Sequence, residues 1–365
     1  MKKSNPVLMK TDFMSLLLKW NKEVNNRQMP WKGEKDAYKI WISEIILQQT
    51  RVEQGLSYYK NFINAFPTVH KLAKASDEKI FKMWEGLGYY SRCRNLIITA
   101  RYISKKLKGH FPDSYEAIMA LKGIGPYTAA AISSFAFNLP YAVVDGNVFR
   151  VLSRVFGLDK PIDSTEGKKL FTTLANELLD KKQPGIYNQA IMDFGAMVCK
   201  PATPLCIDCI FRKKCAAYLQ HKVNELPIKE KKTSVKKRWF YYFLLEHKNE
   251  IAIRKRIAKD IWQSLYEFPL IEAGTEADIN AIFQLAVKKK WILEKMDKQQ
   301  SVSTLYKQQL SHQHISCFFI KIKLQGKPKI INDWVWLDRK LLVNKSFPGI
   351  INQYFIDQKK LINKL

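Results

Sequence analysis

The sequence predicts a mainly helical region followed by a smaller α+β domain. Residues 11–225 have the pattern of helices joined by short connections, and strand signals are scarce before residue 235. The charged run 229–237 is typical of a linker, and beyond it short apolar runs are bounded by polar turns. The chain has 365 residues, more than one hydrophobic core usually serves, so we expect two or three domains.

Two helices of the first region can be placed from their sequence. Residues 31–50 include an apolar stretch that is hydrophobic on nearly every helical face, so this helix should be buried. Asp113 and Glu116 have the spacing of a capping box, which predicts a helix that begins at Asp113 and runs to about Leu121.

The second region should contain a hairpin. The runs 239–245 and 250–256 flank a polar turn at residues 247–249, as the two strands of a hairpin do. Two further strands are expected at 315–324 and 334–337, and two helices at 276–289 and 350–362.

The chain is strongly basic along its whole length. Its formal net charge is +28, and residues 1–226 contain 34 Lys+Arg and 20 Asp+Glu while the rest contains 27 and 13. Such a surface favours a polyanionic partner, of which nucleic acid is the commonest. The alternative is a generally lysine-rich proteome. A hydrophobic content of 47% excludes a disordered chain.

Membrane and secretory signals are missing from the sequence. No run reaches the ~18 apolar residues that a membrane span needs. Lys10, Asp12 and Lys19 interrupt any signal-peptide core. We therefore expect a cytoplasmic protein, a compartment in which structural disulfides are rare.

Four of the six cysteines are crowded into seventeen positions, with six, two and five residues between them: Cys199, Cys206, Cys209 and Cys215. In a reducing compartment this crowding indicates a metal or cluster site. Four thiolates suit either tetrahedral zinc or a [4Fe–4S] cluster, and general chemistry leaves both open. Cys93 and Cys317 are expected to be buried as small hydrophobic residues.

The segment 121–130 predicts a tight hairpin between two helices. Gly123 and Gly125 permit positive φ and close backbone approach, and Pro126 suits the first residue of a helix. The N–H groups of such a turn can hold a DNA phosphate without distinguishing sequence. The alternative is an ordinary corner between two helices.

Two carboxylates are predicted to have opposite environments. Glu44 lies in the apolar helix, where burial should raise its pKa. Asp145 precedes the helical pattern 148–155 as a natural N-cap, where N–H groups favour the ionised form. One protonated and one charged acid suit cleavage of an N-glycosidic bond. Alternatively, Asp145 is only a cap and Glu44 pairs with a basic residue; from the residues alone we favour the cap for Asp145.

Several motifs together resemble one family. Residues 41–50, 86–90 and 144–148 and the cysteine spacing resemble the MutY-type adenine glycosylases, within the helix–hairpin–helix superfamily of base-excision DNA glycosylases. The resemblance is close over about residues 30–215. It implies a six-helix barrel (29–137), an iron–sulfur cluster domain (1–28 and 138–226), a linker (227–237) and a Nudix-like domain (238–365).

The resemblance also implies an activity. Relatives of this kind are monofunctional enzymes that excise adenine mispaired with 8-oxoguanine or guanine in double-stranded DNA. By this likeness Glu44 protonates adenine N7, and Asp145 stabilises or captures C1′ of the sugar. Tyr127 stands where bifunctional relatives such as endonuclease III carry a Schiff-base lysine, and a phenol cannot form that bond. Tyr127 would assist Asp145.

The same resemblance assigns cofactor and DNA contacts. The four cysteines would hold a [4Fe–4S] cluster with a structural role, in a monomer associated with the nucleoid. Gln49 and Tyr89 would fill the gap left by the flipped base, and Trp31 would lie near the adenine; without the resemblance, Tyr89 could be a core aromatic. The remaining DNA contacts would be Lys32, Leu47, Thr50, Gly123, Gly125 and Asn147. Two positions depart from the family. Lys32 stands where relatives often have arginine, and Phe149 stands where some members have lysine.

The C-terminal domain should recognise the partner strand. Residues 260–269 resemble the start of the Nudix-like domain of the family, but 272–285 lacks the glutamate pattern of a Nudix hydrolase. Ser311 and His312 match the end of the family's Phe-Ser-His loop for 8-oxoguanine, and Leu310 replaces its phenylalanine. Without this domain context, Ser-His in a polar loop would mean nothing.

Three other functions compete with adenine excision. An endonuclease III-like glycosylase–lyase is opposed by Tyr127 and by the additional domain. A non-catalytic DNA-damage binder is opposed by the two intact carboxylates, Glu44 and Asp145. A nucleotide pyrophosphatase is opposed by the missing Nudix helix.

Overall fold

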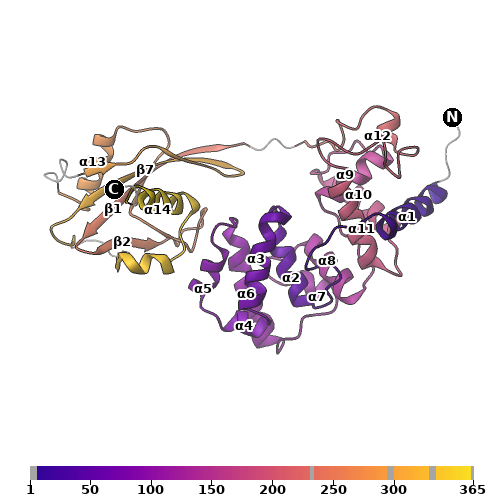
Figure 1. Cartoon of the computed structure of the whole chain (residues 1–365), viewed down its shortest axis with the longest axis horizontal. Coiled ribbons are helices and arrows are strands. Elements are labelled where there is room, and N and C mark those ends of the chain that lie inside the picture. The colour runs from indigo at the N-terminus through magenta and orange to yellow at the C-terminus, as the bar shows by residue number, and fades with distance from the viewer. Residues whose placement is uncertain (1–5, 231–233, 294–299, 329–333, 363–365) are drawn as a thin grey trace. The chain divides into compact units, whose positions relative to one another are not determined.

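The computed structural model describes residues 6–230, 234–293, 300–328 and 334–362. The chain divides into two compact units (Figure 1). The first contains Met1–Lys74 and Asn95–Lys232, and the second contains Ala75–Arg94 and Thr233–Leu365. The domain boundaries expected from the sequence stay a prediction.

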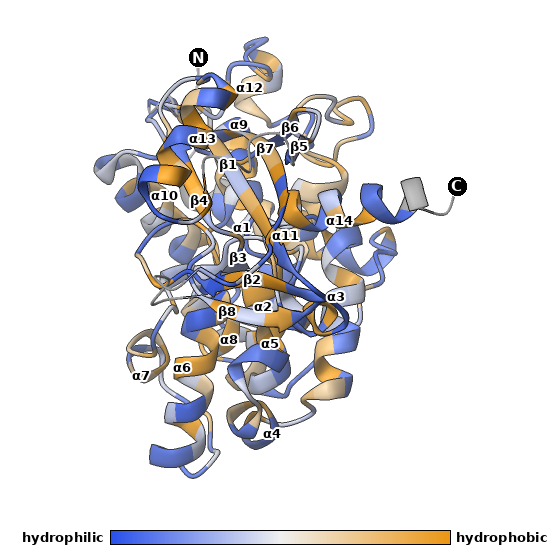
Figure 2. Cartoon of the chain, turned by 90° about the vertical axis from the view of Figure 1, so that its left-hand side faces the viewer, coloured by the Kyte–Doolittle hydropathy of each residue, from blue (hydrophilic) through white to orange (hydrophobic). Residues whose placement is uncertain are grey.

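The first unit is helical, and its described residues contain no strand. Most of α6 (Tyr90–Lys106) belongs to it. Its other helices are α1 (Pro6–Glu23), α2 (Ala37–Leu47), α3 (Val52–Ala65), α4 (Val69–Lys74), α7 (Tyr115–Met119), α8 (Pro126–Phe137), α9 (Gly146–Phe156), α10 (Thr165–Leu178), α11 (Pro184–Met197) and α12 (Ala216–Leu219). Most helices carry both hydrophobic and hydrophilic residues, as amphipathic helices do (Figure 2). Among the described helices of the whole chain, none is long and apolar enough to cross a membrane.

Helix α1 shares a core with the helices that follow α8. Phe13, Leu17 and Trp20 are buried in one hydrophobic cluster with residues of α9, α10 and α11. The Trp20 and Phe194 rings meet edge to face, with centroids 5.1 Å apart. The N-terminal helix is thereby held against the element that carries Asp145.

Helix α2 is buried on nearly every side, as its composition predicts, and it packs against α3 and α8. The expected helix start near residue 113 is shifted by one residue. Ser114, not Asp113, caps α7, because its hydroxyl accepts a hydrogen bond from the N–H of Ala117, and the helix ends at Met119.

The second unit consists of α5 (Asp77–Trp84) with its flanking residues and an α/β domain. The domain includes α13 (Ile279–Lys288), the 3₁₀ helix η2 (Arg339–Asn344) and α14 (Gly349–Ile362). Its strands are β1 (Lys236–His247), β2 (Glu250–Lys255), β3 (Tyr266–Glu267), β4 (Leu270–Ala273), β5 (Gln300–Val302), β6 (Tyr306–Gln309), β7 (Gln313–Lys323) and β8 (Val335–Asp338). The expected hairpin, strands and helices are confirmed.

The sheet of the second unit is mixed. Its central strands β1 and β7 run parallel, in a register that pairs Tyr242 with Phe319, and the other pairings are antiparallel. Helix α13 covers one face, where Phe283 packs near Phe243 in a common core. Helix α14 covers the other, where the Tyr354 ring stacks on Phe319 at 4.1 Å.

Residues 75–94 are tied to the α/β domain by polar contacts within the second unit. Glu78 accepts hydrogen bonds from the Tyr266 hydroxyl at 2.6 Å and from Lys345 at 2.8 Å. The N–H of Phe347 donates to Glu85 at 2.8 Å. The turn that carries Tyr89 is therefore anchored to the C-terminal domain.

Candidate active site

Glu44 is a buried acid in an apolar helix. Glu44 lies on α2 and is only 5% exposed. It forms no ion pair within the described part of the chain. Burial raises the pKa of Glu44 to about 7, a hydrogen bond from Tyr127 lowers it, and the nearby charge of Asp145 raises it. The expected rise in pKa is confirmed, and the expected alternative of a basic partner does not occur among the described residues. Near neutrality this group can donate a proton.

Tyr127 links the hairpin to Glu44. It is the second residue of α8, and its hydroxyl is hydrogen-bonded to the Glu44 carboxyl. Burial raises the pKa of the Tyr127 phenol well above its ordinary value, and the charges of Glu44 and Asp145 raise it further. The phenol is therefore a neutral donor at the site.

Asp145 is the N-cap of α9, as the sequence predicts. One oxygen of Asp145 accepts from the N–H groups of Asn147 and Val148 at 2.8 Å each, and the other accepts from the Asn147 amide at 2.7 Å. Burial nevertheless raises the pKa of Asp145 above its ordinary value, against these hydrogen bonds and the Arg150 charge. The cap hydrogen bonds expected from the sequence are present and favour the ionised form, but desolvation outweighs their effect on the pKa.

Arg150 supports this acid and was not identified from the sequence. Its guanidinium donates to the Asn147 side-chain oxygen at 2.8 Å and to the carbonyls of Gly195 and Cys199 at 2.6 Å. Asn147, an expected DNA contact, is thus held between Arg150 and Asp145. A basic residue three positions after Asn147 on α9 was the available signal, since such residues share a helix face.

The hairpin has the geometry that its glycines predict. Gly123 has φ +82°, and a Cβ there would lie 2.5 Å from Asn95. Gly125 caps α8 ahead of Pro126, and a Cβ at Gly125 would meet no atom within 4 Å. The backbone at Gly125 is therefore open to close approach, which suits a phosphate at a helix N-terminus.

The expected DNA contacts of the first unit lie in different settings. Gln49 is exposed with φ +55°, two residues after Leu47, the last residue of α2. Such a backbone is uncommon for a residue other than glycine and is found at functional sites. The Thr50 N–H donates to the Leu47 carbonyl at 3.1 Å, so both belong to the same turn.

Trp31 and Lys32 are held in place by packing and charge. Trp31 is buried, with its ring edge to face with Tyr59 at 5.3 Å. Lys32 forms a 3.2 Å ion pair with buried Asp193, which also pairs with Arg27. The ion pair of Lys32 with Asp193 thus joins Lys32 to α11.

Tyr89, Ser311 and His312 come together in the second unit. Tyr89 is 38% exposed with φ +44°, so it is not a core aromatic, and its hydroxyl is hydrogen-bonded to Ser311. Ser311 and His312 are exposed in the loop between β6 and β7. All three residues line a pocket of about 490 Å³, together with Arg94 and Asp260.

The four cysteines interact with one another in the loop after α11. Cys199, Cys206 and Cys215 all act electrostatically on the thiol of Cys209, and burial, the largest cause, raises the pKa of Cys209 to about 12. Arg154 Nη1 donates to Cys199 Sγ at 3.6 Å, and the Phe211 N–H to Cys209 Sγ at 3.4 Å. Donors of this kind stabilise the thiolates of iron–sulfur sites.

The described residues hold no group of three His, Cys, Asp or Glu side chains placed to bind one metal ion. A single ion would draw all four sulfurs to about 2.3 Å from one centre. A four-iron cluster instead takes the thiolates on different irons. The donor set, four thiols in one loop with N–H and guanidinium donors, fits such a cluster. The metal assignment itself stays a prediction.

The comparisons with known proteins agree with this arrangement. Residues 42–177 match the HhH-GPD superfamily of base excision DNA repair proteins, and residues 241–356 match the NUDIX domain. The chain is 34% identical over 265 residues to the adenine DNA glycosylase of Buchnera aphidicola subsp. Acyrthosiphon pisum, covering 73% of this chain and 76% of that relative. The chain belongs to the adenine DNA glycosylase family. For the glycosylase of Buchnera aphidicola subsp. Baizongia pistaciae the identity is 37% over 258 residues, covering 70% of this chain and 73% of the relative.

The fold of this family member has relatives among solved structures. A thermostable thymine-DNA glycosylase matches with a TM-score of 0.55 at 29% identity, covering 59% of this chain and 100% of that chain. The helix–hairpin–helix fold and the α+β Nudix-like domain expected from the sequence are therefore confirmed. The roles of individual site residues stay proposals.

Proposed function

We propose that this chain removes adenine mispaired with 8-oxoguanine or guanine from double-stranded DNA and leaves an abasic site. The observation that carries the proposal is Glu44. It is a buried carboxyl whose pKa is raised to about 7, hydrogen-bonded to Tyr127 and within the electrostatic reach of Asp145. Membership of the adenine DNA glycosylase family supports the choice of base.

In the proposed reaction, the adenine is flipped out of the duplex and protonated at N7 by Glu44. Protonation lets the C1′–N9 bond break with its electron pair leaving on the base. The sugar becomes an oxocarbenium-like cation, which the Asp145 carboxylate stabilises or transiently captures. Water then adds at C1′ and gives up one proton, which the Glu44 carboxylate can take back, so the products are neutral adenine and the abasic site.

Tyr127 makes the reaction monofunctional. A strand-cleaving lyase needs an amine that forms a Schiff base with the opened sugar, and a phenol has none. The Tyr127 hydroxyl instead donates to Glu44 and assists at the sugar beside Asp145. Strand breakage should therefore need added alkali.

Recognition of the partner base is assigned to the second unit. Adenine is a normal base, so information about the mispair must come from the opposite strand. Ser311 and His312 would contact 8-oxoguanine from their exposed loop, and Tyr89 and Gln49 would each help to fill the gap left by the flipped base. A hydroxyl and an imidazole can accept or donate at the altered N7 edge of the oxidised base.

The cysteine loop is proposed to hold a [4Fe–4S] cluster through Cys199, Cys206, Cys209 and Cys215. The cluster would supply structural cross-linking of the loop. We expect purified protein to be brown, with about four iron atoms per chain. A colourless protein with stoichiometric zinc after anaerobic purification would contradict the assignment. The chain is further proposed to act as a monomer in the cytoplasm, at the nucleoid.

The test is an incubation of the protein with an 8-oxoguanine:adenine duplex, followed by strand analysis with and without alkali. We expect breaks only after alkali and no efficient covalent trapping by borohydride. Efficient trapping would make the chain a lyase. Binding without any alkali-labile site would make it a non-catalytic damage binder.

A further inference from the structure

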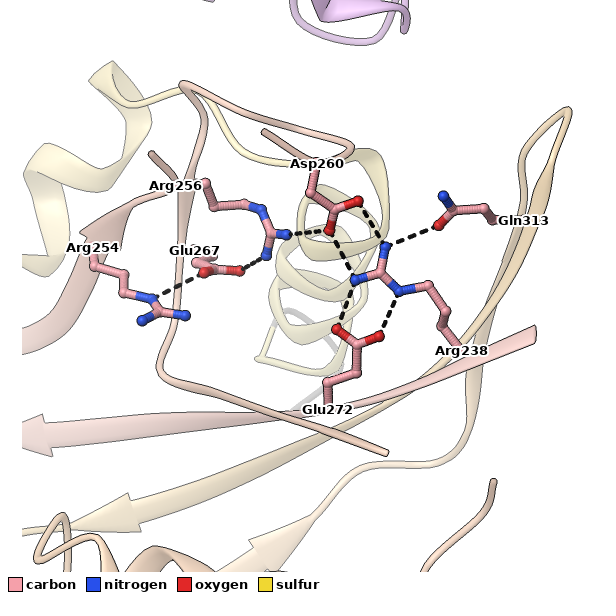
Figure 3. Close-up of polar contacts among 7 residues, drawn as sticks. All are labelled: Arg238, Arg254, Arg256, Asp260, Glu267, Glu272 and Gln313. Carbon is pink, nitrogen blue, oxygen red and sulfur yellow. Dashed lines mark hydrogen bonds and ion pairs between the residues drawn. The ribbon is translucent and has the colours of Figure 1, made fainter. Parts of the chain in front are cut away.

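A network of charged side chains crosses the α/β domain (Figure 3). Glu267 lies between Arg254 and Arg256, and Asp260 lies between Arg256 and Arg238. Arg238 also contacts Glu272 and Gln313 at the end of the network. Three arginines and three acids leave the network without net charge.

Arg238 is the most connected member. Its side chain is 7% exposed and lies on β1. It donates two hydrogen bonds to Asp260, at 2.8 and 3.0 Å, two to Glu272, both at 2.6 Å, and one to Gln313 at 3.0 Å. These contacts use all five N–H groups of a guanidinium. A lysine has three donors and no planar fork, so it could not make them together.

One end of these contacts lies at the base of the loop formed by residues 310–312. Gln313 is the first residue of β7, directly after His312, and its carbonyl accepts from the N–H of Leu310 at 2.8 Å. The His312 carbonyl accepts from the N–H of Lys236 on β1 at 2.9 Å. The side-chain bond from Arg238 to Gln313 therefore adds a second tie between β1 and the base of this loop.

The other end lies on a second wall of the same pocket. Asp260 begins the segment 260–262, which lines the pocket of about 490 Å³ together with Tyr89, Ser311 and His312. Hydrogen bonds from Arg238 and the Arg charges lower the pKa of Asp260 below its ordinary value, although burial opposes them. Asp260 is thus ionised at neutral pH and held by both Arg238 and Arg256.

We propose that Arg238 is a positioning residue for partner-base recognition, because its guanidinium fixes the 310–312 loop and the 260–262 segment at one spacing. Arg238 acts through Gln313 and Asp260. Its own charge is compensated by the carboxylates of Asp260 and Glu272. The inference rests on the proposed role of Ser311 and His312. It predicts that specificity depends on a buried residue that does not touch DNA.

The test uses two substitutions of graded severity and one control. Arg238→Lys keeps the charge but loses the fork, and Gln313→Leu removes only the bond to the loop. Arg339→Met is the control, because its ion pair with Glu246 lies outside the network and its side chain is 50% exposed. For each variant we would measure thermal unfolding, affinity, and single-turnover excision on 8-oxoguanine:adenine and guanine:adenine duplexes.

We expect Arg238→Lys to reduce the ratio of excision rates, 8-oxoguanine:adenine over guanine:adenine, by roughly tenfold. Gln313→Leu should reduce the same ratio by less. Excision from guanine:adenine should change little, and Arg339→Met should match the wild type. Wild-type ratios in both network variants would overturn the inference. So would an equal fall on both duplexes that follows lost thermal stability, since Arg238 would then have only a structural role.

The proposed function fails in a different way. If the wild-type chain excises adenine equally from both duplexes, the proposed recognition of the partner base is contradicted. If it excises adenine from neither duplex, excision itself is contradicted. In either case the inference about Arg238 fails as well. A wild type that discriminates while Arg238→Lys and Gln313→Leu discriminate equally well contradicts the inference alone.

Discussion

Carboxyl groups have opposite surroundings in the two units. In the helical unit, Glu44 has no cationic partner among the described residues, and burial raises its pKa to about 7. In the second unit, Asp260, which is partly buried, lies between two guanidinium groups that lower its pKa. Glu267, almost fully buried, also contacts two arginines.

The difference separates two uses of a carboxyl group. A buried acid without a cation keeps its proton and can donate it, at a cost to stability once it ionises. An acid held by arginines, such as Asp260, stays charged and fixes the backbone around it, and removing one partner leaves an uncompensated charge. The first use suits chemistry and the second suits positioning.

The largest expected effect is at Glu44. Glu44→Gln keeps the size of the side chain and removes its acidic proton, so single-turnover excision should fall by a factor on the order of 10²–10⁴. Affinity for the mispaired duplex should stay close to that of the wild type. Equal losses of binding and excision would show that Glu44 supports the fold or the DNA contact and not the chemistry.

Asp145→Asn separates the charge of the cap from its hydrogen bonds. An asparagine still caps α9, so the midpoint of thermal unfolding should change little. Excision should fall by roughly 10²–10³, because the sugar cation loses its facing charge. Asp36→Asn at the cap of α2 is a matched control that should excise normally. If both variants behave like the wild type, Asp145 is a cap and nothing more.

A smaller effect is expected in the second unit. Changing Ser311 and His312 together to Ala should narrow the preference for 8-oxoguanine:adenine over guanine:adenine by about 1–3 kcal/mol. Excision by Glu44 and Asp145 should persist on any duplex that binds. His247→Ala, at the opposite end of β1, is the control. An unchanged ratio would move partner recognition to Gln49, Thr50 and Tyr89.

The smallest expected effect is a shift in pH dependence. The proposed reaction needs protonated Glu44, so the rate of excision should fall as pH rises through the Glu44 pKa of about 7. The Tyr127 hydrogen bond lowers that pKa, so Tyr127→Phe should move the alkaline limb to higher pH. If the alkaline limb of the Tyr127→Phe variant moves to lower pH, the Tyr127 hydroxyl raises the pKa of Glu44, which contradicts the role assigned to it.

The sequence predicted the elements well because their causes are local. The apolar pattern of α2, the turn residues of the β1–β2 hairpin and the N-cap at Asp145 all lie within a few positions of the structure that they specify. The cap of α7 was placed one residue early, since Asp113 and Ser114 both suit an N-cap and only the structure shows which hydroxyl or carboxylate bonds the helix.

Contacts between distant residues could not be predicted. Arg150 reaches Cys199 from 49 positions away, and Arg238 reaches Gln313 from 75 positions away. The net direction of the pKa of Asp145 was also missed, because the cap is local whereas the burial that outweighs it depends on tertiary packing. The Glu44 environment was predictable since most residues of α2 are apolar.

The most direct test of the account is the ionisation of Glu44 itself. Protein labelled with ¹³C at the glutamate carboxyl groups would be titrated by NMR, and the spectrum of Glu44→Gln would identify the signal that disappears. We predict a midpoint of about 7 for Glu44, the pKa that burial gives it against the Tyr127 hydrogen bond. A midpoint at the ordinary glutamate value of 4.5 would contradict the account, since Glu44 would then carry no proton to give at neutral pH.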